Sequence, residues 1–201
     1  MQFFADTPIL TAAYRHVLQL LQPVKHYAYH NIGHTLDVFR RSRQLAEQEG
    51  ISEAEQVPLL LAALFHDTGF IESYSKNEII GMRLARSWLE SQDYPESRIT
   101  EVERLIEVTI PFTPAKTLLE KIIQDADLDN FGRDDCFSKM YRVEEELKEM
   151  TSLDTRTMYD IFRSLHTYNF QTSTAQRDRQ PKRLSNREKF ENLYATKFAS
   201  Q

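Results

Sequence analysis

The order of apolar and polar side chains along the chain predicts an almost entirely helical protein. Apolar residues recur at spacings of three and four, strict alternation is scarce, and the sequence contains only five glycines. The longest apolar run, Leu59 to Phe65, predicts a helix that is buried on all sides. This run leads directly into His66 and Asp67, and Gly69 is expected to break the helix just beyond them.

Caps, prolines and glycines predict where the other helices begin and end. Three starts depend on a capping box: Ser52 with Glu55, Thr100 with Glu103, and Ser185 with Glu188. We expect helices over residues 7–21, 31–48, 52–66, 79–91, 100–110, 114–127, 134–150, 154–170 and 185–198, and a loop over Thr172–Pro181. The predicted fold is all-α, a single domain spanning 1–201. Its motif-bearing central part is expected at about 26–133, with helices of about 134–201 packed on it. A frayed C-terminal tail is the alternative to a docked last helix.

Composition narrows the functional classes. Hydrophobic residues make up 41% and charged residues 27%, as in ordinary globular proteins. A net charge of -5 argues against binding a nucleic-acid polymer or a membrane surface. The single cysteine, Cys136, is expected to be a small apolar residue that fills space in the core. Because one cysteine cannot form a disulfide within the chain, a reducing compartment is expected. The chain lacks an apolar run of about 20 residues and a signal-like N-terminus, so we expect a cytoplasmic protein.

Four side chains of the types that bind metals are predicted to face inward: His34, His66, Asp67 and Asp127. The His66-Asp67 pair alone is explained equally well by a buried hydrogen bond. Four such groups together point to a cation or to a large buried polar network. Nitrogen and oxygen ligands of this kind suit a divalent Mn, Mg, Fe, Co, Ni or Zn ion.

Three motifs that carry these residues resemble the HD superfamily of metal-dependent phosphohydrolases. The order His34, His66-Asp67, Asp127 is similar to the H…HD…D signature of that superfamily. The run YHNIGH at 29–34 looks like the YHNxxH motif of cyclic-nucleotide phosphodiesterases, and Asp125-Ala126-Asp127-Leu128 is similar to the DADL run of bacterial HD domains. The resemblance covers roughly residues 26–133 and implies an all-helical bundle and hydrolysis of phosphoesters.

The resemblance also implies roles for individual residues. His34, His66, Asp67 and Asp127 would hold the first metal, and Asp67 would bridge to a second metal if one binds. His30 would act as a catalytic group that protonates the leaving oxygen; its alternative role is to stabilise the start of the helix. Because residues 68–126 contain no further histidine, one tight metal with at most a weak second site is expected.

Other polar residues are weaker candidates, each with a structural alternative. Glu72, Lys76 and Arg133 are the candidate substrate contacts, and Asn77, Glu78 and Lys116 are further candidates. Each of these residues is explained equally well as part of a solvated loop, a helix cap or a surface charge. His166 is expected to be a hydrogen-bonded core histidine. His16 and His26 are expected at surface or helix-end positions.

The leading functional hypothesis is an enzyme, a metal-dependent phosphoric ester hydrolase. It would cleave a monoester or diester of a small phosphorylated molecule, a nucleotide by preference, through attack of water bound to the metal. The first alternative is a regulatory HD module that binds a metal and a nucleotide without hydrolysis. A di-iron oxygenase ranks lower, because its additional ligands are not found. A homodimer formed through the C-terminal helix is an alternative to packing of that helix in the core.

Overall fold

The structure is a computed structural model that describes residues 7–199. Within this range the chain forms α-helices and short 3-10 helices and no strands, which confirms the predicted all-α class. The α-helices are α1 (Pro8–Leu20), α2 (Ile32–Gln48), α3 (Glu53–Phe65), α4 (Asn77–Ser91), α5 (Glu96–Glu107), α6 (Leu118–Asp127), α7 (Cys136–Met150), α8 (Thr155–Leu165) and α9 (Ser173–Phe198). The 3-10 helices are η1 (Gln22–Val24), η2 (Thr68–Ile71) and η3 (Asp129–Gly132).

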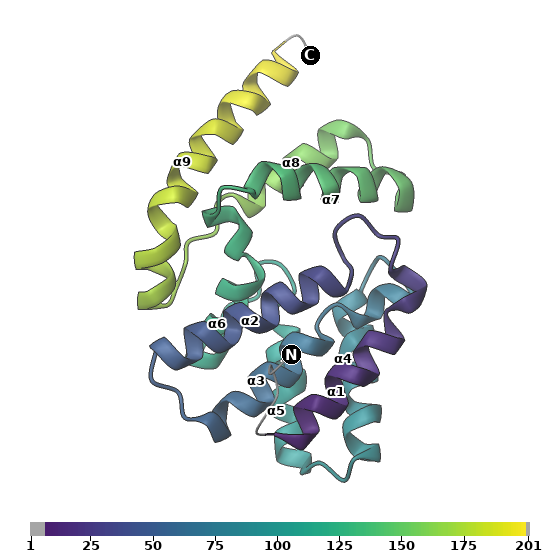
Figure 1. Cartoon of the computed structure of the whole chain (residues 1–201). Helices are drawn as coiled ribbons and strands as arrows, with labels where there is room; N and C mark the ends of the chain where they lie inside the picture. Colours follow the sequence, from purple (N-terminus) through teal and green to yellow (C-terminus); the bar gives the residue numbers. More distant parts are fainter. Residues whose placement is uncertain (1–6, 200–201) are drawn as a thin grey trace.

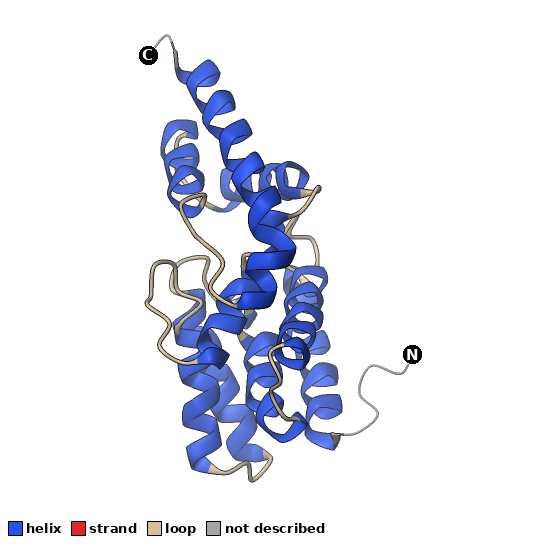
Figure 2. Ribbon diagram, turned by 90° about the vertical axis from the view of Figure 1, so that its left-hand side faces the viewer, coloured by secondary structure: helices blue, strands red, loops and turns tan. Residues whose placement is uncertain are grey.

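The helices form two groups, shown in Figure 1. Helices α1 to α6 make the lower group, and α7, α8 and the later part of α9 make the upper one. Each group has its own apolar core: the larger is built around α3, and the smaller contains Met158, Phe162, Phe190 and neighbours from α7 to α9. Figure 2, seen from the side, shows α9 running along both groups. The last helix is therefore docked, as predicted, through residues such as Phe190 and Tyr194.

Helix α3 is the centre of the larger group. Every residue from Leu59 to Phe65 is at most 2% exposed, because α1, α2, α4, α5 and α6 surround the helix. The predicted capping box of Ser52 and Glu55 begins it. The continuous apolar run therefore carries His66 and Asp67 into the interior.

Two predicted helix starts were wrong. Helix α5 begins at Glu96 after Pro95, so Thr100 lies inside it and its hydroxyl donates to the Glu96 carbonyl. Helix α6 begins after Thr117, whose hydroxyl accepts a hydrogen bond from the Glu120 backbone. Pro95 and Thr117 mark the true starts of these two helices, whereas the predictions placed the starts at Thr100 and Pro114.

The predicted loop over Thr172–Pro181 was also wrong. Thr172 caps a continuous helix, and its hydroxyl accepts from the Ala175 backbone. Pro181 lies inside α9, as do Ser185 and Glu188, so their predicted capping box does not form. Helix α8 ends at Leu165, several residues before the predicted end.

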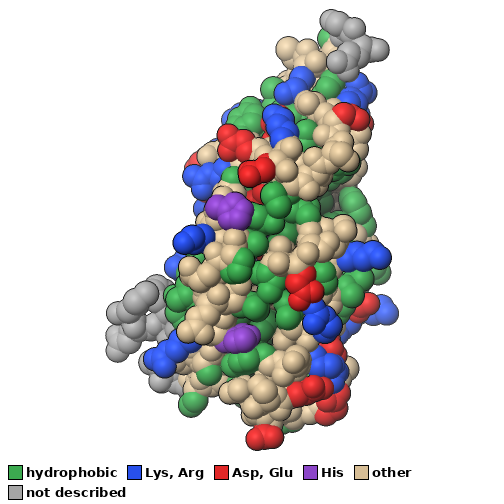
Figure 3. Space-filling view, turned by 90° about the vertical axis from the view of Figure 1, so that its right-hand side faces the viewer, with side chains coloured by type: hydrophobic (Ala, Val, Ile, Leu, Met, Phe, Trp, Pro, Cys, Tyr) green, Lys and Arg blue, Asp and Glu red, His purple; other side chains and the backbone are tan. Residues whose placement is uncertain are grey.

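The surface of residues 7–199 mixes charged and apolar side chains. Figure 3 shows one face, where hydrophobic side chains reach the surface between the two groups of helices. No helix in the described range is both long and apolar enough to cross a bilayer.

Candidate metal centre

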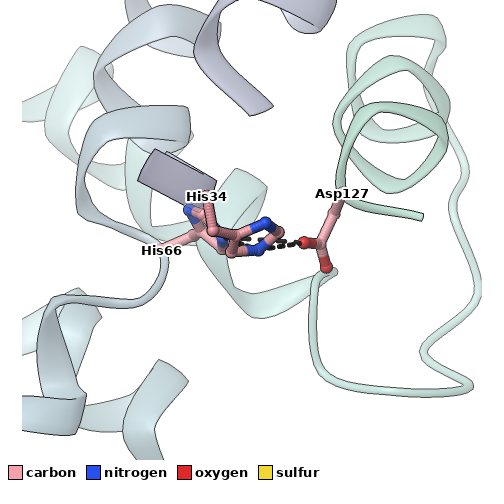
Figure 4. A group of neighbouring side chains, drawn as sticks. All are labelled: His34, His66 and Asp127. Atoms are coloured by element: carbon pink, nitrogen blue, oxygen red, sulfur yellow. Dashed lines mark hydrogen bonds and ion pairs between the residues drawn. The ribbon is translucent and has the colours of Figure 1, made fainter. Parts of the chain in front are cut away.

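Three helix ends meet between the two groups of helices. His34 lies in the first turn of α2, His66 directly follows α3, and Asp127 is the last residue of α6. Figure 4 shows the two imidazole rings and the Asp127 carboxylate converging on one point. Because the C-terminal end of a helix carries partial negative charge, the ends of α3 and α6 both favour a cation at this point.

The four predicted ligands approach one another closely. The Nε2 atom of His34 lies 3.1 Å from Asp127 Oδ1 and 3.3 Å from Asp67 Oδ2. The Nε2 atom of His66 lies 3.2 Å from Asp67 Oδ2 and 3.6 Å from Asp127 Oδ1. The two Nε2 atoms are 3.4 Å apart. Ligand atoms of His34, His66 and Asp127 all lie within 4.8 Å of one another.

These spacings fit a shared cation better than a hydrogen-bonded network. Two ligand atoms held about 2.1 Å from one ion lie about 3.0 Å apart in an octahedral arrangement and about 3.4 Å apart in a tetrahedral one. The buried Asp67 Oδ2 accepts no hydrogen bond from the described residues, although two imidazole nitrogens stand beside it. A buried oxygen without a hydrogen bond costs free energy, and a divalent ion would satisfy it. The residues present therefore fit the ion that the sequence predicted.

Neighbouring groups fix the orientation of the ligands. The Nδ1–H of His66 donates to the Ala63 carbonyl at 3.0 Å, so in the neutral imidazole, the form that binds a metal, the lone pair is on Nε2. The side-chain amide of Asn77 donates to Asp67 Oδ1 at 3.2 Å. Gly69 makes this contact feasible, because a Cβ there would lie 1.9 Å from the Asn77 carbonyl oxygen. Gly69 thus allows α4 to approach the His66-Asp67 pair.

The centre is strongly polarised. Burial raises the pKa of Asp67 and of Asp127, but their histidine neighbours outweigh it and hold both pKa values below the usual range. Burial lowers the pKa of His66, and the charges of Asp67 and Asp127 outweigh it and hold that pKa well above the usual value. Two ionised carboxylates in this interior therefore require positive charge between them.

A second polar cluster lies beside the centre and depends on Glu146 of α7. Its Oε1 atom is 2.5 Å from His30 Nδ1 and accepts from the Tyr74 hydroxyl at 3.0 Å. Its Oε2 atom accepts from the backbone of Tyr29 and His30 at 2.8 and 3.0 Å. The His30 ring stacks on Phe70 with 4.3 Å between ring centres. Sequence reasoning missed Glu146, because one glutamate in the run 144–146 carries no signal that sets it apart.

The contact between Glu146 and His30 alters both pKa values. Burial lowers the pKa of His30, but the hydrogen bond to Glu146 and the nearby carboxylates outweigh it and raise that pKa. Burial raises the pKa of Glu146, and the His30 contact more than reverses this effect. With Nδ1–H donated to an ionised Glu146, the Nε2 atom of His30 is available to another group.

A cavity of about 620 Å³ opens onto both clusters. His30, His34, Asp67 and Asp127 line one side of it, and Asn77 and Glu78 lie beside them. Much of the remaining lining is apolar and comes from residues 108–115, α7 and α8. The cavity has the size of a site for a small organic ligand, for which about 300–1,000 Å³ is typical.

The predicted substrate contacts Glu72, Lys76 and Arg133 do not line the cavity. Glu72 pairs with Arg83 at 2.6 Å, Lys76 is exposed, and Arg133 is bound to Asp135 at 2.7 Å. Lys116 is also exposed and outside the lining.

Two further predictions concern buried groups outside the metal centre. Cys136 is buried in the cavity wall, and burial raises its pKa to about 12, so its expected role as a filler holds. His166 is a core residue, as predicted, but its expected hydrogen bonds are absent among the described residues. Its ring instead stacks on Phe190 and meets the edge of Phe131.

Comparison with known proteins supports the class that this fold and site define. Residues 31–129 match the family model of the HD domain. This segment is therefore an HD domain, which confirms the family that the motifs predicted. The similarity of residues 29–34 to the YHNxxH motif remains a prediction.

Two solved structures share the fold. A crystal structure of a Lactobacillus plantarum protein has a TM-score of 0.70 and 19% sequence identity, and the alignment covers 96% of this chain and 99% of that one. The Lin1889 protein of Listeria innocua has a TM-score of 0.62 and 21% identity, with 92% and 93% covered. At such identities the likeness concerns the fold alone. The sequence has no match among curated proteins.

Proposed function

We propose that the protein is a metal-dependent phosphohydrolase that cleaves an ester of a small phosphorylated molecule, with nucleotides as the first compounds to test. The observation that supports it most directly is the convergence of the buried His34, His66 and Asp67 with the partly buried Asp127 at a ligand-sized cavity. Family membership agrees, because HD domains are mostly metal-dependent hydrolases.

The four side chains would hold one divalent ion. Such an ion polarises a phosphoryl oxygen and lowers the pKa of a coordinated water to near neutrality. Neutral imidazole and ionised carboxylate are the protonation states that bind it. The apolar cavity wall would exclude bulk water from the reacting phosphate, so these charges would act in a medium of low polarity.

His30 would be the general acid. It lines the cavity beside His34, with 5.9 Å between the two ring centres. Glu146 would hold the ring through Nδ1 and keep the pKa of His30 raised, which favours the protonated ring that a general acid requires. The proton would pass from Nε2 to the leaving oxygen, which then departs as an alcohol. Tyr74 and the backbone of residues 29–30 would fix Glu146 itself.

The test is turnover of phosphate esters by protein loaded with Mn, Co, Ni, Zn, Mg or Fe. We expect hydrolysis with at least one metal, and a fall in kcat/KM of at least about a thousand-fold in His66→Ala and Asp67→Ala, since the loss of a ligand removes the ion. Asp134→Ala is the control, because Asp134 is an exposed aspartate outside the cavity lining that pairs with Lys182. Absence of turnover with every metal and ester, in protein shown to contain metal, would refute the proposal.

A further inference from the structure

The charges around the cavity suggest which phosphate compounds it accepts. Three carboxylates line it, from Asp67, Glu78 and Asp127, and one divalent ion would balance two of them. Within residues 7–199, no lysine or arginine lines the cavity. Enzymes and proteins that bind polyphosphates supply cations for the additional phosphate groups, because each adds negative charge. The described lining of this cavity has no lysine or arginine that could pair with a second or third phosphate group.

Cations close to the cavity are already paired with carboxylates. Arg133 binds Asp135 through two hydrogen bonds of 2.9 and 2.7 Å. Lys139 lies 2.7 Å from Asp37 Oδ2 and above the ring of Tyr29. Arg133 also lies 3.7 Å from Asp37 Oδ2, so both cations are held by carboxylates outside the cavity lining. Either side chain would have to give up an ion pair to reach a ligand in the cavity.

The rest of the cavity suits an apolar or aromatic group. Met140, Val143 and Leu147 present one apolar face of α7 to it, and Phe162 and Leu165 add a face of α8. Burial of a hydrocarbon or ring surface against this part of the lining would therefore stabilise a bound ligand.

Phe112 is an exposed aromatic residue in the cavity lining. It is 72% exposed, although an apolar ring of this size usually packs away from water. Its φ of 66° lies in the left-handed region, which a bulky L-residue adopts rarely. Strained conformations of this kind are concentrated at ligand sites. Phe112 therefore lines the cavity in a backbone conformation that is unfavourable for a bulky residue, which is the kind of strain found at ligand sites.

We infer that the cavity selects esters with a single phosphate group whose other part is aromatic or apolar, and that it discriminates against nucleoside diphosphates and triphosphates. The inference rests on the proposed phosphohydrolase function, because the phosphate is taken to lie at the ion. The aromatic part lies between Phe112 and the apolar faces of α7 and α8. A nucleoside monophosphate or an aryl phosphate meets this description, and a triphosphate does not.

Binding measurements on the full-length, Mn-loaded protein test the inference independently of turnover. Two ligand pairs isolate its two parts. Phenylphosphonate and methylphosphonate differ in whether a ring is present. A nucleoside phosphonate, in which a methylene group replaces the ester oxygen of the monophosphate, and the methylene-bridged triphosphate of the same base differ in phosphate number. We expect the first member of each pair to bind at least about ten-fold more tightly. Equal or reversed affinities in either pair would overturn the inference.

Two variants locate the aromatic contact. Phe112→Ala should reduce the preference for phenylphosphonate over methylphosphonate by at least about five-fold, which is the lower bound for loss of one stacking partner. Leu184→Ala, at an exposed apolar residue of α9 outside the cavity, should leave the preference unchanged. An unchanged preference in Phe112→Ala would contradict the assigned position of the ring. Turnover is scored separately: its absence with every metal and ester, together with the expected binding, would refute the proposed hydrolase and leave the selectivity of binding intact.

Discussion

Glu146 links a helix of the upper group to the residues that precede α2. Its carboxylate receives four hydrogen bonds, from two backbone N–H groups, Tyr74 and His30. A side chain with all its acceptor positions occupied holds a fixed geometry, which is what a general acid needs from its support. His30 itself could be predicted from its motif, but its partner lies 116 residues away and no local pattern marks it.

Replacing Glu146 by Gln should shift the pH dependence of catalysis. Because Glu146 raises the pKa of His30, the variant should lose the protonated imidazole at lower pH, and the basic limb of kcat/KM should move to lower pH. We expect kcat for alkyl esters to fall about 10–100-fold, and kcat for p-nitrophenyl esters to fall less, since nitrophenolate leaves without a proton. Glu145→Gln, at the exposed neighbour, is the control. Equal losses for both ester types would argue against acid catalysis by His30.

The imidazole of His166 makes stability depend on pH. Burial, with the nearby charge of Arg183, lowers its pKa to about 4 from an ordinary value near 6.5. The unfolded chain therefore binds a proton before the folded one, so stability is complete above pH 6.5 and falls as the pH drops toward 4. The loss is about 3 kcal/mol at most.

Urea unfolding between pH 7 and pH 4 measures this effect. His166→Phe should remove that part of the pH dependence, because phenylalanine has no proton to gain and the site is already aromatic. His26→Phe, at an exposed histidine, should retain it. The same pH slope in His166→Phe and the natural protein would show that another group is responsible.

At the level of helices, predictions succeeded where one local signal dominated. The run Leu59 to Phe65 identified the central helix, and Ser52 with Glu55 identified its start. They failed where a distant residue decides the local structure. The start of α9 is held by Asp125, whose carboxylate accepts from the backbone of Gln171 and Thr172. No pattern within residues 172–181 could reveal that anchor, so polar composition and Pro181 suggested a loop.

Gly69 is the position at which the approach of α4 can be tested. A methyl group there would collide with the backbone carbonyl of Asn77, and no side-chain rotation relieves the contact. Gly69→Ala should reduce the free energy of unfolding by about 2–4 kcal/mol and weaken metal binding, because Asn77 would move from Asp67. At Gly33→Ala the obstacle is the Asn31 side-chain oxygen, which caps α2, so the cost should be limited to about 1 kcal/mol, the usual cost of a lost cap. Calorimetry and metal titration distinguish the two, and similar costs would contradict the close approach.

For the molecule as a whole, the ion would connect segments that are far apart in the sequence. His34, His66 and Asp127 come from α2, the end of α3 and α6, so an ion bound to all of them stabilises only the folded chain. At a free metal concentration of 100 times Kd the gain is about 2.7 kcal/mol, or roughly 5–10 °C in Tm for a chain of this size.

Thermal unfolding with and without a chelator measures this stabilisation. The metal-dependent rise in Tm should disappear in His66→Ala and Asp127→Ala and persist in Glu146→Gln, which leaves the ligands in place. A rise that survives in His66→Ala would place the ion elsewhere.

The predicted ligands could be found because they lie in short motifs, whereas the cavity wall could not, since its residues come from three separate segments.

The segment that matches the HD domain ends at residue 129, before α7 begins. The predicted metal ligands thus belong to the matched segment, while Glu146, the partner of His30, and much of the apolar lining come from the helices that follow it. Exchange of α7 and α8 between proteins of this architecture would be expected to transfer ligand preference and leave metal affinity with the recipient.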